Sequence, residues 1–164
     1  MAENADDVMR LSDEEIIKMH FDMVYRLALA QTKSVSNAED VTQEVFLRFV
    51  QNRKKLQSGK HIKAWLLRVT VNCSKSVFLN SWFKKTVPLT DEITFDTPEK
   101  SEVYYAVQTL PSKYRTVVHL FYYEDMSVKE IADCLGMNES TVKSHLFRAR
   151  ELLRKELKGG YDFV

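Results

Sequence analysis

The chain has 164 residues, of which 45% are hydrophobic, and its 24 basic and 23 acidic residues give a formal net charge of +1. This length accommodates one medium domain or two small ones, and the balanced charge excludes a surface that is basic throughout. Only four residues are glycine and three are proline. Helix-forming residues dominate the rest, so we expect an all-α protein.

Neither the cysteines nor the N-terminal segment indicates a secreted or metal-binding protein. Cys73 and Cys134 are far apart and have no ligand-like spacing, so we expect buried reduced thiols and neither a disulfide nor a metal site. Residues 1–7 are acidic, unlike a signal peptide, and no apolar run approaches the roughly 20 residues of a membrane span. We therefore expect a cytoplasmic protein without membrane insertion.

Capping signals and apolar periodicity predict three helices in the first half of the chain. Ser12 and Glu15 form a capping box. Apolar residues follow it at helical spacing, namely Ile16, Ile17, Phe21, Val24, Leu27 and Ala28. Ser36 with Glu39 predicts a second helix to about Asn52, and a third helix is expected from about His61 to Phe83.

The composition changes at residues 86–101, which include two prolines and four acidic residues against one lysine. Prolines fix φ and remove helix donors, so we interpret this segment as a flexible, acidic linker. Helices are then expected at 102–109, 111–123, 127–134 and 139–158, with Pro111 at a first helical position and a frayed tail at 159–164. The predicted fold is two small helical domains, residues 1–85 and 102–158, joined by that linker.

The segment that begins at Val128 has the spacing of a helix-turn-helix. Ala132, Gly136 and Val142 supply a small residue at the helix crossing, a turn residue that tolerates positive φ, and a branched residue that plugs into the core.

At about 100° per residue, Val142, Leu146, Ala149 and Leu153 share one face of the last helix. The opposite face carries hydroxyls, cations and one aromatic ring, which suits the major groove of DNA. Its candidate DNA-binding residues are Ser140, Thr141, Lys143, Ser144, Phe147 and Arg148.

The second and third helices each have a polar face opposite an apolar one. In the second, Asp40, Gln43, Glu44 and Leu47 lie away from the core residues, and an apolar side chain among acids suits a protein partner. Periodicity alone favours an ordinary surface leucine there. In the third helix, Arg68, Asn72 and Lys75 lie opposite the apolar stripe, with Ser76 beside them and Lys84 and Lys85 after them. Cations and aromatic rings are what unpaired DNA requires, and the resemblance given below is what makes these six residues candidates for binding it.

Three motifs give these faces a shared interpretation. AEDVTQEVFLRF (38–49) resembles region 2.2 of the sigma-70 family, WLLRVTVNCSKS (65–76) resembles regions 2.3–2.4, and the helix-turn-helix resembles region 4. Response-regulator domains share the Thr-Val-Lys-x-His run at 141–145, but no receiver pattern precedes it. Together the motifs resemble an extracytoplasmic-function sigma factor. Thr42 departs from the pattern, which usually has an apolar residue there.

The resemblance implies a division of labour. The face of Asp40 would bind the β′ coiled coil of core RNA polymerase, Asn72 would line a pocket for a flipped base of the −10 element, and the last helix would read the −35 element. Region 4 would also contact the β flap, and an anti-sigma factor is an expected partner. One alternative is a helix-turn-helix regulator that acts without polymerase, and a second is an interaction protein with decayed DNA binding, such as a regulator that sequesters polymerase. The histidines are scattered and the sequence has no phosphate-binding loop, so we expect a protein that is not an enzyme and binds no cofactor.

Overall fold

A computed structural model describes residues 5–81 and 101–157, with side chains described for 7–77 and 101–157. Within those ranges the chain is helical and has no strand, which confirms the all-α prediction. It divides into two compact units, Met1–Asp91 and Glu92–Val164, in agreement with the prediction of two helical domains. Apart from Ser101, the predicted linker lies outside the described residues, as does the predicted tail.

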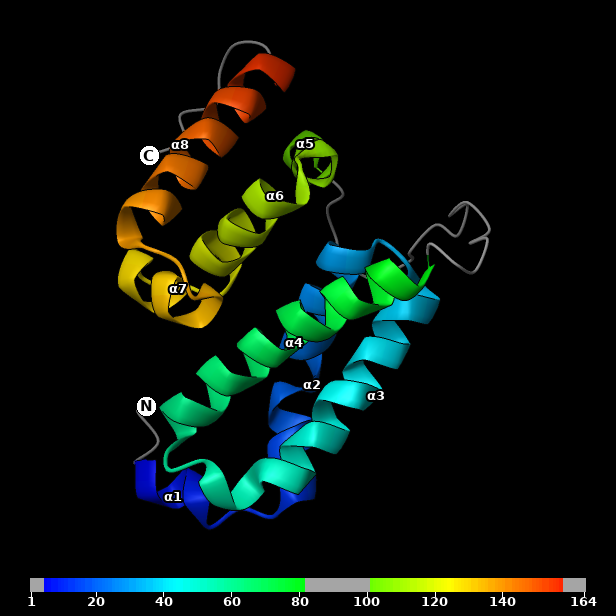
Figure 1. Cartoon of the computed structure of the whole chain (residues 1–164), viewed down its shortest axis with the longest axis vertical. Helices are drawn as coiled ribbons and strands as arrows, with labels where there is room; N and C mark the ends of the chain where they lie inside the picture. Colours follow the sequence, from blue (N-terminus) through cyan, green and yellow to red (C-terminus); the bar gives the residue numbers. More distant parts are fainter. Residues whose placement is uncertain (1–4, 82–100, 158–164) are drawn as a thin grey trace. The chain divides into compact units, whose positions relative to one another are not determined.

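The first unit is built on three long helices that lie side by side (Figure 1). They are α2 (Asp13–Thr32), α3 (Val35–Asn52) and α4 (Gly59–Ser81). Each contributes a fully buried apolar stripe, which includes Ile16, Val24 and Leu27 from α2, Val41, Val45 and Phe49 from α3, and Ile62, Leu66 and Leu67 from α4. Since each stripe recurs at helical spacing, packing the stripes together gives one continuous core.

The start of α2 follows the sequence prediction, whereas the start of α3 does not. The Ser12 amide donates to the Glu15 carboxylate over 2.8 Å, and the Glu15 amide donates to the Ser12 hydroxyl over 3.2 Å. The box predicted at Ser36 is wrong, because Ser34 caps α3 and accepts a 3.2 Å bond from the Asn37 amide. A serine two residues earlier satisfies the free amide without a glutamate.

The short helix α1 (Ala5–Met9) was not expected from the sequence, and it packs against α4. Val8 is buried there, and a Cβ on Gly59 would lie 3.3 Å from its side-chain atoms. Gly59 therefore permits this close approach. The 3-10 turn η1 (Arg53–Lys55) follows α3, and its Arg53 donates to the carbonyls of Met9 and Leu11 over 3.3 Å each. These contacts hold α1 in place.

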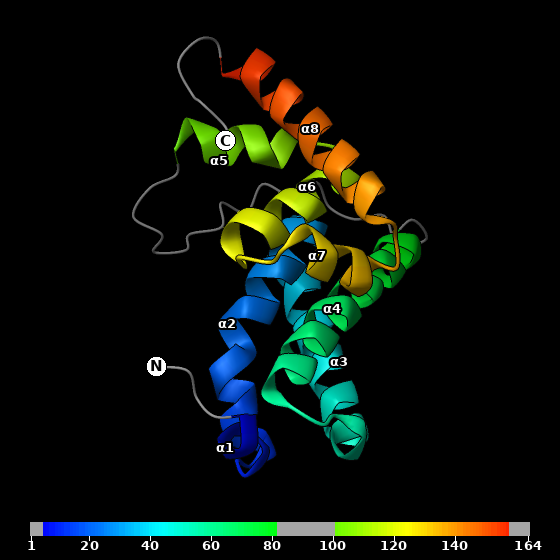
Figure 2. The same cartoon turned by 90° about the vertical axis from the view of Figure 1, so that its left-hand side faces the viewer.

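The second unit contains α5 (Glu102–Thr109), α6 (Ser112–Val118), the π-helical turn η2 (His119–Tyr123), α7 (Val128–Leu135) and α8 (Glu139–Glu156). Figure 2 shows α8 rising from the α7 turn and α5 lying near its far half. Pro111 precedes α6 as its cap instead of occupying its first position, and the helix predicted over 111–123 changes to a π turn at His119. Arg115 is buried and donates to the Leu110 carbonyl over 2.7 Å, which ties α6 to the end of α5; burial lowers its pKa.

Two sequence signals place the helix-turn-helix correctly. Ser127 and Glu130, which have the spacing of a capping box, form one at the start of α7, with bonds of 3.2 and 3.1 Å. Gly136 ends α7 with a φ of 65° and donates to the Ala132 carbonyl. Nothing lies within 4 Å of where its Cβ would be, so this position requires glycine for its backbone conformation and not for space.

Both cysteines are buried, as predicted, and burial raises the pKa of Cys73. Over the described residues, no helix has the length and apolar character needed to cross a bilayer.

Candidate interaction surfaces

The outer face of α3 presents the predicted combination of acids and one apolar anchor. Asp40, Gln43 and Glu44 are exposed, and Leu47 is 55% exposed. Behind them, Val45 and Phe49 are fully buried. The structure thus brings the four predicted residues together on one solvent-facing surface, which we call the α3 face.

Glu44 is held within this face by an ion pair with Arg48, whose Nε lies 2.8 Å from the carboxylate. Both side chains remain almost half exposed. Asp40 is exposed one turn earlier on the same face. The α3 face therefore offers a carboxylate, an amide and a leucine to a partner that supplies cations and an apolar pocket.

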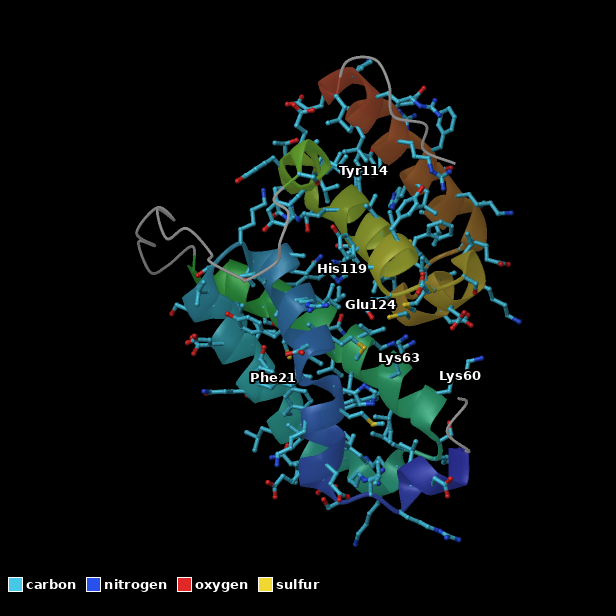
Figure 3. The ribbon with its side chains drawn as sticks, turned by 180° about the vertical axis from the view of Figure 1, so that it is seen from behind. Phe21, Lys60, Lys63, Tyr114, His119 and Glu124 are labelled. Carbon is cyan, nitrogen blue, oxygen red and sulfur yellow. The ribbon has the colours of Figure 1, made fainter. Side chains whose placement is uncertain are left out.

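The α3 face is larger than the sequence indicated, because Phe21 of α2 and Val50 of α3 extend it. Phe21, which fits the apolar spacing of α2 and is labelled on that helix in Figure 3, is 45% exposed. Its ring stacks on Phe46 at 6.1 Å and on Tyr25 at 6.0 Å between ring centroids. Val50, one turn after Leu47, is 46% exposed. Phe21 lies at the margin of the buried stripe of α2, and that position was the signal that could have identified it.

Thr42, where the sigma-70 pattern usually has an apolar residue, is accommodated in the core of the first unit. It is 3% exposed, and its hydroxyl donates to the Ala38 carbonyl over 2.7 Å. Because a bond within the helix satisfies the hydroxyl, the side chain packs in the core much as an apolar residue would. The departure leaves the α3 face unchanged.

The polar face of α4 is exposed as predicted. Arg68, Asn72, Lys75 and Ser76 all face solvent, while Leu66, Thr70 and Ser74 are buried on the other side. Trp65 is half-buried, and its ring centroid lies 6.4 Å from that of Phe49. Lys84 and Lys85 lie outside the described residues.

This α4 face is longer than the motif indicated. Lys60, His61 and Ala64 are exposed one to two turns before Arg68, and Figure 3 shows Lys60 and Lys63 at the beginning of the helix. The four-residue steps from Lys60 through Ala64 and Arg68 to Asn72 were the available signal. The exposed stripe therefore extends over most of α4 and is cationic toward its N-terminal end.

Helix α8 separates core and polar faces as its periodicity predicted. Val142, Leu146, Ala149 and Leu153 are buried. The exposed face carries Ser140, Lys143, Ser144, Phe147 and Arg148, with Thr141 partly buried at its edge. Phe147 is 59% exposed, so an aromatic ring projects from a cationic surface. We call this the α8 face.

His145 lies on the side of α8 that packs against Tyr114 of α6. Its ring meets the Tyr114 ring edge-on, with 5.4 Å between the centroids. The Lys113 ammonium lies 5.0 Å from the same Tyr114 centroid. Burial, together with the charge of Lys113, lowers the pKa of His145. Within the described part of the chain its Nδ1 is buried and forms no hydrogen bond. The neutral ring is therefore the form that fits this position.

Comparison with protein families divides the chain in the same way as its fold. Residues 16–82 match the family model for sigma-70 region 2, and residues 100–153 match the model for sigma-70 region 4.

Individual relatives and solved structures agree with the family models. The chain is 30% identical over 139 residues to the RNA polymerase sigma factor SigV of Bacillus subtilis strain 168, covering 81% of this chain and 83% of SigV. It is 29% identical over 164 residues to the ECF RNA polymerase sigma factor SigW of the same organism, with 88% of each chain covered. Its fold is similar to that of the sigma factor RpoE of Bartonella quintana, solved with the anti-sigma factor NepR, at a TM-score of 0.67 and 18% identity over 88% of this chain and 95% of RpoE.

Proposed function

Because this chain belongs to the extracytoplasmic-function group of the sigma-70 family, whose members bind core RNA polymerase and direct promoter-specific initiation, we propose that its α3, α4 and α8 faces divide that task. The observation that carries the proposal is the pairing of two unlike surfaces in one chain. The first unit exposes a leucine among acids, and the second exposes an aromatic ring among cations.

The α3 face is the proposed site for the β′ coiled coil. Asp40, Gln43 and Glu44 supply acceptors for a basic partner, and Leu47 supplies an apolar anchor of the kind that dominates interface energies. The stacked ring of Phe21 and the exposed Val50 would enlarge the apolar part of that contact. Such a surface has no evident role in a protein that only binds DNA.

The α4 face is the proposed site for the opened −10 strand. Arg68 and Lys75 would bind its phosphates, while Asn72 and Ser76 offer hydrogen bonds to a base that has left the stack. Lys84 and Lys85 would add charge beyond the end of α4. The exposure of Lys60 and His61 supports a longer path for the strand along the helix.

The α8 face is the proposed reader of duplex −35 DNA. Lys143 and Arg148 can reach guanine edges or phosphates, Phe147 can contact a thymine methyl, and Ser140, Thr141 and Ser144 supply short hydrogen bonds. The acidic linker of residues 86–101 would let the two units span the promoter, and region 4 would meet the β flap.

We further propose an anti-sigma factor as the regulator of this chain, because the similar sigma factor RpoE was solved in complex with the anti-sigma factor NepR. The role is regulatory and not catalytic, and it is exerted in the cytoplasm, where RNA polymerase acts.

A gel-shift comparison separates this function from that of a helix-turn-helix regulator acting alone. Promoter fragments would be mixed with the chain, with core polymerase, or with both. We expect a sequence-specific complex that resists heparin only when both are present. A specific complex of equal affinity with the chain alone would favour the simple regulator.

A further inference from the structure

Arg150 of α8 is held by two aromatic residues of the π turn η2, 28 residues earlier in the chain. Its Nε donates to the Tyr122 hydroxyl over 2.9 Å, and its guanidinium carbon lies 5.8 Å from the Phe121 ring centroid and 5.9 Å from that of Tyr122. The two rings meet edge-on at 4.9 Å. This arrangement fixes a side chain that would otherwise sample many rotamers.

The bond to Tyr122 leaves most of the guanidinium available. Arginine has five N–H donors, and in the part of the chain that the structure describes Arg150 forms no other hydrogen bond or ion pair. Tyr122 is itself 39% exposed. The group therefore combines a fixed orientation with four donors, a geometry suited to bidentate binding of a phosphate.

The position of Arg150 on α8 indicates which phosphate it would bind. At about 100° per residue it lies roughly 20° from Lys143 and roughly 60° from Phe147, between the α8 face and the core. A helix in the major groove directs the centre of its outer face toward base edges and its flanks toward the sugar–phosphate walls. A flanking arginine that is already ordered meets the wall and not the bases.

We propose that Arg150, held by Phe121 and Tyr122, is a preassembled anchor for a phosphate of duplex DNA beside the site read by the α8 face. The proposal rests on duplex binding by α8, which is part of the proposed function, but not on polymerase binding. An ordered arginine gives up little entropy on binding, so the anchor would strengthen binding to any duplex sequence and would position α8 in the groove.

The test measures binding of the full chain to two labelled duplexes of unrelated sequence by fluorescence anisotropy over a series of KCl concentrations. Arg150→Gln should weaken binding about five-fold on both duplexes and reduce the slope of log affinity against log salt by about 0.9. Tyr122→Phe removes only the hydroxyl, so it should weaken binding about two-fold while retaining the slope, because the charge remains. Lys18→Gln removes a charge from the 75% exposed end of an ion pair in the first unit and should change neither value.

Circular dichroism would verify that each variant is folded. If Arg150→Gln does not fold, the affinity of Tyr122→Phe is the test of the proposal. The anchor would be overturned if both folded variants kept the wild-type affinity and slope. A loss of affinity confined to one duplex would also overturn it, because that result indicates base reading. So would a wild-type chain that binds no duplex. If both variants weaken duplex binding as expected but core polymerase never joins the chain on a promoter, the proposed function is wrong while the phosphate anchor stands.

Discussion

The Arg53 guanidinium lies 3.2 Å from the Asp13 carboxylate and thereby links the turn after α3 to the first residue of α2. Arg53 is mostly buried, with 16% of its side chain exposed, and it also lies over the Phe49 ring at 5.8 Å. Together with its bonds to Met9 and Leu11, it joins α1, α2 and α3 at one end of the first unit.

Replacement of Arg53 should therefore destabilise the first unit. Arg53→Met retains much of the apolar stem but leaves the Met9 and Leu11 carbonyls and the Asp13 carboxylate without this donor. We expect the free energy of unfolding to fall by about 1.5–3 kcal/mol, the range for hydrogen bonds to charged groups. Urea denaturation measures this change. Lys18→Met is the control, since its pair with Glu14 is highly exposed and should contribute at most about 0.5 kcal/mol.

A charge reversal on the α3 face should abolish polymerase binding without unfolding the chain. Asp40 is exposed, so Asp40→Arg places a cation opposite a basic partner at no cost to the core. We expect loss of copurification with core polymerase and unchanged helix content by circular dichroism. Asp7→Arg, an exposed reversal on α1 and outside the residues of this face, should copurify normally. Retention of polymerase by Asp40→Arg would remove Asp40 from the interface.

Truncation of Arg148 should weaken recognition of the −35 element. The side chain is exposed on the α8 face, and loss of a base-edge contact costs about 1–3 kcal/mol. Arg148→Ala holoenzyme should lose affinity for the wild-type −35 sequence and discriminate less against substitutions in it, as measured by filter binding. Unchanged discrimination would assign Arg148 to the backbone or to no contact.

The stability of the second unit should fall on acidification because of His145. Its pKa is lowered in the folded chain by burial and by Lys113, so the unfolded chain takes up the proton first as the pH falls through the ordinary value of 6.5. The contribution is complete above that value and is lost below it. Thermal melts at about pH 7 and pH 5 measure the difference.

His145→Gln should show a smaller difference between the two melts than the wild type, whereas Lys18→Gln should not, because Lys18 is highly exposed on α2 of the first unit. If the two variants lost the same amount of stability on acidification, the pH dependence would have to come from other groups.

Much of this fold follows from local sequence. The capping boxes at Ser12 and Ser127, the glycine at 136 and the apolar stripes of α3 and α8 each determine an element through neighbouring residues alone. The exposure of the predicted residues on the α3, α4 and α8 faces follows from the same periodicity, since the opposite face of each helix is apolar.

The features that escaped prediction depend on residues distant in sequence. Helix α1 has only five residues and is held by Arg53 and by the space at Gly59. Phe21 fits an apolar period but is kept outside by its stack on Phe46 of α3. The π turn at His119 interrupts a pattern that reads as one helix, and only the fold reveals that its Tyr122 meets Arg150.

The central claim is that this chain enables RNA polymerase to start transcription at particular promoters, and run-off transcription from a library of genomic fragments tests it most directly. Core polymerase would be assayed with the wild-type chain, with Asp40→Arg and without either. We expect discrete transcripts from a small set of fragments only when core polymerase is assayed with the wild-type chain. Transcripts that are the same with and without the chain, over the whole library, would contradict the claim.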